Sequence, residues 1–65
     1  MNDQGIILAE LTAIERELTA KCKSIDKGIR ENPELRKDEE VLLQQRIWKA
    51  QLLKVRQEIR QIRSN

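Results

Sequence analysis

The residues Glu31-Asn32-Pro33-Glu34 stand at the middle of this 65-residue chain, between two long stretches with a helical pattern of apolar residues. Asparagine suits a helix cap, proline suits the first helical position, and glutamate favours the positive end of the helix dipole. We therefore predict a turn at about residues 31–34, a first helix at about 3–30 and a second helix at about 34–63. A start of the second helix near Asp38, with residues 31–37 as a longer loop, is the alternative.

On both sides of this turn, apolar residues recur at gaps of three and four, which is the spacing of one helix face. The seam positions of the first helix form an eleven-residue repeat, typical of a nearly straight helix: Ile7, Leu11, Ile14, Leu18, Cys22, Ile25 and Ile29. Those of the second helix form a seven-residue repeat: Val41, Gln45, Trp48, Leu52, Val55, Ile59 and Ile62. A mirror fold about Pro33 would pair Ile7 with Ile59, Leu11 with Val55, Ile14 with Leu52, and Leu18 with Trp48. The sequence predicts a single all-α domain over residues 1–65, an antiparallel hairpin of two long helices.

The second helix carries further apolar residues on the side away from this seam: Leu42, Leu43, Ile47, Ala50 and Leu53. A helix that is apolar on two faces is usually buried on both. A chain of 65 residues is also near the lower limit for a self-sufficient core. We therefore expect self-association into a four-helix bundle or a larger helical oligomer, or burial against a protein partner. The alternative is a few apolar residues tolerated at the surface.

The net charge of +2 is unevenly distributed, with −3 over residues 1–20 and +5 over residues 41–65. Five cations follow one face of the second helix and are candidates for binding nucleic acid or a small anion: Arg46, Lys49, Arg56, Arg60 and Arg63. A solvated, partly ion-paired face is the alternative. Within the hairpin, the edge formed by Lys49, Arg56 and Arg63 should face Leu8, Glu15 and Cys22.

The residue inventory argues against an enzyme. The chain has no histidine, one cysteine and two isolated glycines, so zinc sites, histidine-based catalysis and glycine-rich phosphate loops are excluded within one chain. We expect no catalytic residue, no metal and no cofactor. Cys22 suits a small, buried apolar role in the seam. Trp48 suits a core anchor or, alternatively, a binding hot spot for a partner.

The lone cysteine fits a reducing compartment, and no run approaches the ~18 apolar residues of a membrane span. These features predict a cytoplasmic protein without a membrane partner. The leading hypothesis is a small non-enzymatic protein that self-associates and acts through protein–protein contacts as an adaptor, inhibitor or regulator. A regulator that binds RNA or DNA is the first alternative, and an oligomer that sequesters a small anion or nucleotide is the second.

Overall fold

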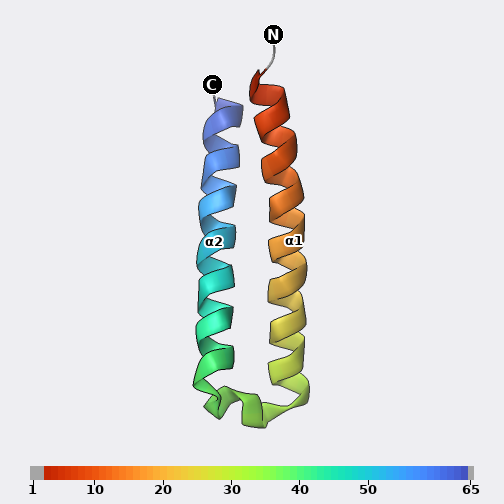
Figure 1. Ribbon diagram of the computed structural model, residues 1–65, viewed down its shortest axis with the longest axis vertical. Helices are drawn as coiled ribbons and strands as arrows, with labels where there is room; N and C mark the ends of the chain where they lie inside the picture. Colours follow the sequence, from red (N-terminus) through yellow and green to blue (C-terminus); the bar gives the residue numbers. More distant parts are fainter. Residues whose placement is uncertain (1–2, 65) are drawn as a thin grey trace.

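The computed structural model describes residues 3–64 and contains two long helices that pack side by side in opposite directions (Figure 1). Helix α1 spans Asp3–Glu31, a short 3-10 helix η1 spans Pro33–Lys37, and helix α2 spans Glu39–Ser64. Asp3 and Ser64, the first and last described residues, lie at one end of the hairpin, and η1 closes the other. No strand occurs within residues 3–64. The predicted helical hairpin is confirmed.

Pro33 ends the first helix but does not begin the second. Asn32 has φ −131° and ψ 85°, because the proline ring disfavours the α conformation in the residue before it. The chain then makes one tight turn, in which the N–H of Leu35 donates to the carbonyl of Asn32 at 3.0 Å. The N–H of Asp38 donates to the carbonyl of Leu35, also at 3.0 Å. Residues 33–37 therefore form a 3-10 helix rather than the first turns of α2.

The predicted start of the second helix at Pro33 is wrong, and the alternative near Asp38 is right. The carboxylate of Asp38 accepts hydrogen bonds from the N–H groups of Glu40 at 3.0 Å and Val41 at 3.4 Å. The side chain of Asn32 makes no such bond. Asp38 thus satisfies N–H groups that have no partner inside the helix, and so it fixes the first residue of α2 at Glu39.

The inward face of α1 differs from the predicted one in its first half. Ile7 and Ile14 were expected in the seam but are 46% and 43% exposed, whereas their neighbours Leu8 and Glu15 are half-buried. The inward residues of α1 therefore recur every seven positions: Leu8, Glu15, Cys22 and Ile29 in one row, and Leu11, Leu18 and Ile25 in the next. Because the seam of α2 also repeats every seven residues, this row keeps facing α2 along its length, which an eleven-residue row would not do.

The pairing of the two helices is displaced from the mirror about Pro33 by about one helical turn. Leu18 clusters with Leu52, the residue four positions beyond its expected partner Trp48. The cross-seam hydrogen bonds from Arg56 to Glu15 and from Gln45 to Asp26 are displaced in the same direction, by five positions. The displacement follows from the turn, because η1 lengthens the connection and moves its midpoint from Pro33 to Leu35.

The core of the hairpin is thin. Five residues are buried, namely Leu18, Cys22, Ile29, Leu52 and Ile59, and none of them is completely enclosed. Half-buried Trp48 and Val55 pack against the cluster of Leu18, Cys22 and Leu52. The molecule measures 51 × 15 × 14 Å, with a radius of gyration of 14.8 Å, against about 10.7 Å for a compact chain of this length. Neither helix of the described chain contains a stretch long and apolar enough to cross a membrane.

We expect Asp38→Ala to lower the free energy of unfolding by about 1 kcal/mol, because it removes the cap of α2. The matched control is Asn32→Ala, which removes a side chain without a capping hydrogen bond and should change stability by less than about 0.5 kcal/mol. Urea denaturation at equal protein concentration measures both. Equal losses for the two variants would contradict the assignment of Asp38 as the cap.

Candidate functional site

One long side of the hairpin is basic, and we call it the basic side. On α2 it includes all five cations singled out from the sequence. Arg56, Arg60 and Arg63 line one hollow with Glu15, while Lys49 and Arg56 line the next with Leu53. Arg46 lies seven residues before Leu53 and therefore continues the same helix face. The five cations are thus brought together along one flank of α2.

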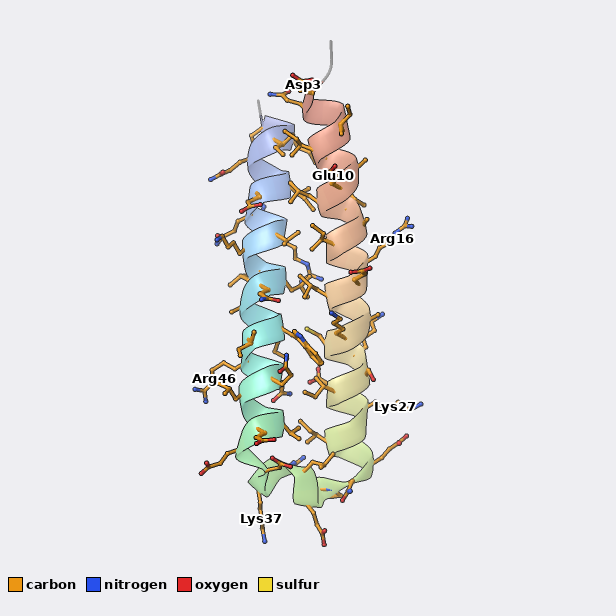
Figure 2. All side chains as sticks on the ribbon, in the orientation of Figure 1. Asp3, Glu10, Arg16, Lys27, Lys37 and Arg46 are labelled. Atoms are coloured by element: carbon orange, nitrogen blue, oxygen red, sulfur yellow. The ribbon has the colours of Figure 1, made fainter. Side chains whose placement is uncertain are left out.

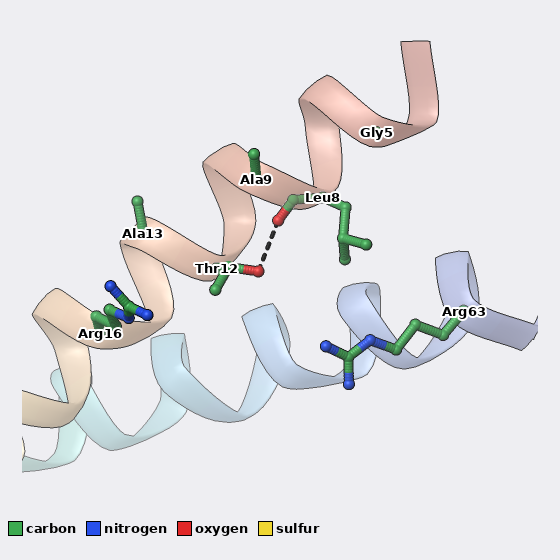
Figure 3. A pocket seen from close by; sticks show the side chains of 7 residues that line it. All are labelled: Gly5, Leu8, Ala9, Thr12, Ala13, Arg16 and Arg63. Carbon is green, nitrogen blue, oxygen red and sulfur yellow. Dashed lines mark hydrogen bonds between the residues drawn. The ribbon is translucent and has the colours of Figure 1, made fainter. Parts of the chain in front are cut away.

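Helix α1 adds three cations to the same side, which the sequence pattern had not revealed. Arg16 lines a hollow together with Arg63 of α2, beside the small side chains of Ala9 and Thr12 (Figure 3). Lys23 and Arg30, seven and fourteen residues further along α1, line a hollow with Asp26 and with Lys27 and Glu31, which pair with each other so that their charges cancel. Figure 2 shows Arg16 and Arg46 extending away from the seam at opposite edges of the hairpin. The basic side therefore spans both helices.

Two ion pairs cross the seam on the basic side. Arg56 Nε donates to Glu15 Oε2 at 3.3 Å, and Lys49 Nζ lies 3.4 Å from Asp26 Oδ1. The first pair agrees with the expected facing of the α2 edge toward Glu15. All four side chains are at least 32% exposed, so each pair contributes at most about 1 kcal/mol. The two pairs occupy Lys49 and Arg56. The other six of the eight cations named for this side form no ion pair within the described residues.

The carboxylate of Asp26 has a lowered pKa. The pKa of Asp26 is lowered from 3.8, chiefly by the hydrogen bond that Gln45 Nε2 donates to it at 2.6 Å. Partial burial opposes this shift, and the positive charges of Lys49 and Arg30 add to it. Gln45 and Lys49, both on α2, therefore hold Asp26 in its charged form.

The opposite side of the hairpin is acidic, and we call it the acidic side. Its position is marked by a hollow near the turn that Ser24, Gly28, Glu40, Gln44 and Trp48 help to line. Seven-residue steps along the two helices from these positions place five carboxylates on this side: Asp3, Glu10, Glu17, Glu40 and Glu58. The same steps place only two cations there, Lys21 and Lys54.

The fold therefore separates charge across the hairpin rather than along it. The basic side has eight cations against Glu15, Asp26 and Glu39, a net charge of +5. The acidic side has two cations against five carboxylates, a net charge of −3. In the sequence this division is visible only as an acidic first third and a basic last third, because the two sides draw residues from both helices.

The predicted apolar face of α2 divides between these surfaces. Leu43, Ile47 and Ala50 are exposed and lie on the part of α2 turned away from α1 or toward the acidic side. Leu53 is 60% exposed but lies on the basic side, between Lys49 and Arg56. Leu42 is half-buried within the single hairpin, so its placement on a free outer face is corrected. The five residues do not form one surface.

The remaining candidates, Cys22 and Trp48, are both engaged in the seam. Cys22 is a free thiol and is buried beside Leu18 and Leu52. Trp48 packs against the same cluster, and the Lys21 ammonium lies 5.7 Å from the centre of its ring, on the acidic side. Within residues 3–64, no group of three histidine, cysteine or acidic side chains is placed to hold a metal ion.

Protein-family models, curated proteins and solved structures were each compared with this chain, and none of them matches it. Function must therefore be inferred from the two sides of the hairpin themselves.

The lowered pKa of Asp26 has a consequence for acid stability. A carboxylate whose pKa is lower in the folded chain stabilises the fold above its ordinary pKa of 3.8, and this contribution is lost as the pH falls through the folded value. We expect Asp26→Asn to reduce the free energy of unfolding by less than about 1 kcal/mol at pH 7, because Asp26 is partly solvated. The difference should vanish near pH 2. Denaturation at both pH values tests this, and a difference that is independent of pH would contradict it.

Proposed function

We propose that this protein is a non-enzymatic helical hairpin that self-associates and acts through protein–protein contacts, as an adaptor, inhibitor or regulator. The supporting observation is that six large apolar side chains remain exposed on a single hairpin: Ile6, Ile7, Ile14, Leu43, Ile47 and Leu53. They come from both helices, and together they outnumber the five buried residues of the core.

The total surface area supports this proposal. The hairpin exposes 5509 Å², whereas a compact monomer of 7.7 kDa is expected to expose about 4,300 Å². The excess of about 1,200 Å² exceeds the roughly 800 Å² that each partner buries in a typical stable interface. Association of two hairpins would bring the surface of each chain into the usual range.

The contact is proposed to involve α2 and the acidic side. Leu43, Ile47 and Ala50 form a ridge on α2 with gaps of four and three, so they can pack against another helix. Ile7 and Ile14 of α1 lie on the acidic side with Ile47, whereas the basic side carries only Leu53 among these exposed apolar residues. A contact here joins apolar residues of both helices and leaves the eight cations of the basic side outside.

The energetic argument depends on the size of the core. Full burial of a leucine or isoleucine contributes about 1.5–3 kcal/mol relative to exposure. The core of a chain this small rarely contributes more than about 3–5 kcal/mol in total. Burial of Leu43 and Ile47 between copies therefore adds a stabilisation comparable to that of the whole seam.

We expect Leu43→Glu with Ile47→Glu to dissociate the assembly and to lower its melting temperature, because two charges replace apolar contacts. The matched control is Gln57→Glu with Gln61→Glu, which places the same charges on the same two helix faces fourteen residues further along α2. Light scattering coupled to gel filtration gives the molar mass of each variant. The control should keep the mass of the wild type.

A wild-type mass equal to one chain, together with a melting temperature that is the same for wild type and Leu43→Glu/Ile47→Glu, would contradict self-association.

A further inference from the structure

The proposed self-association leaves the positive charge of the basic side exposed. We propose that it binds double-stranded nucleic acid through the phosphate backbone, without reading the base sequence. This inference does not depend on the proposed function, because a contact through the acidic side leaves the basic side of each copy exposed.

The first argument is the number and spacing of the charges. From Arg46 to Arg63 the basic side of α2 extends over about 25 Å, at 1.5 Å per residue. A duplex carries one phosphate charge per 1.7 Å of its axis, so this length presents about seven charges on the face turned toward the protein. Eight cations, with a net charge of +5 for the whole basic side, match that number.

The second argument is that most of these cations keep their charge available. Arg56 and Lys49 form ion pairs with Glu15 and Asp26. By contrast, Arg16, Arg60 and Arg63 make no ion pair among the described residues. Arg16 and Arg63 come from different helices and line one hollow (Figure 3). Gly5 and Ala9 form part of its wall, so little side-chain bulk separates the hollow from an approaching phosphate strand.

The third argument concerns the form of the nucleic acid. Proteins that bind single strands stack the bases on aromatic side chains. The one aromatic residue of the chain, Trp48, packs in the seam and is covered from the acidic side by Lys21. With no aromatic ring on the basic side, phosphate contact with a duplex is favoured over stacking with a single strand.

The competing occupant is the acidic side of a second copy, whose net charge is −3. That arrangement would place Ile7, Ile14 and Ile47 against guanidinium and ammonium groups, although interface cores are depleted of charged residues. It would also join unlike faces, which produces open chains unless the rotation closes a ring. Nucleic acid is therefore the better match, and the second copy becomes an outcome of the test.

The test measures binding of the full chain to a labelled 20-base-pair duplex of mixed sequence, as DNA and as RNA, and to a single strand of the same length. We expect both duplexes to bind, and the single strand to bind more weakly. With about five phosphate contacts, the affinity should fall several hundred-fold between 50 and 200 mM salt. Millimolar inorganic phosphate or ATP should not displace the duplex beyond its effect on ionic strength.

The decisive variant is Arg16→Glu with Arg60→Glu, one cation from each helix. The matched control is Arg36→Glu with Lys37→Glu, which changes the net charge equally at exposed positions of η1, outside both sides. The first variant should lose at least tenfold in affinity and show a weaker salt dependence, whereas the control should stay within about threefold of the wild type. Arg16→Gln with Arg60→Gln should also lower the affinity, by a smaller factor. This variant replaces the glutamate variant in the test if the latter does not fold.

Three results would overturn the proposal. The first is no duplex binding by the wild type at 50 mM salt, and the second is an equal loss in the basic-side variant and its control. The third is dissociation of the assembly by Arg16→Glu with Arg60→Glu, seen by light scattering on the same samples without nucleic acid. That result would assign the basic side to a second copy. A failure of self-association itself would instead appear as a single-chain mass for the wild type, whatever the duplex affinity.

Discussion

The packing of Leu18 and Cys22 against Leu52 is the contact on which the rest of the hairpin depends. Within residues 3–64 it is the one place where buried side chains from both helices form a continuous cluster, and it fixes how far α1 is shifted along α2. Once Leu18 lies beside Leu52, the seven-residue rows on either side of the seam follow. Glu15 then comes within reach of Arg56, and Asp26 within reach of Gln45 and Lys49. These polar contacts are exposed and weak, so they report the register rather than set it.

The same register divides the charges of the molecule between two sides. Rows that flank the seam on one side contain eight arginines and lysines from both helices. The rows on the other side contain Asp3, Glu10 and Glu17 of α1 and Glu40 and Glu58 of α2. A shift by a few residues would move Arg63 away from the hollow that it shares with Arg16. Assembly through apolar residues and nucleic-acid binding through phosphates are therefore compatible proposals, because they use different sides of one rod.

The sequence predicted the two helices and their antiparallel packing, because a proline between two periodic apolar stretches leaves few alternatives. It did not predict the start of α2, since Asn32 and Asp38 are both good capping residues and only the hydrogen bonds of Asp38 distinguish them. The inward face of α1 was also ambiguous. Ile7 and Leu8 are adjacent and both apolar, and Glu15 occupies an inward position that a search for apolar residues passes over. The sequence did not reveal the three cations of α1 on the basic side. Their row of α1 lies beside the cations of α2 only because of the register in which the two helices pack.

The most direct test of this account is a nuclear Overhauser measurement between methyl groups in the seam. A sample mixed from isotope-labelled and unlabelled chains separates contacts within one chain from contacts between copies. The account predicts strong contacts between the methyl groups of Leu18 and Leu52 within one chain. Contacts from Leu52 to Ile14, and from Ile59 to Ile7, in place of the contact to Leu18, would show the mirror register about Pro33 and would contradict the arrangement of both sides.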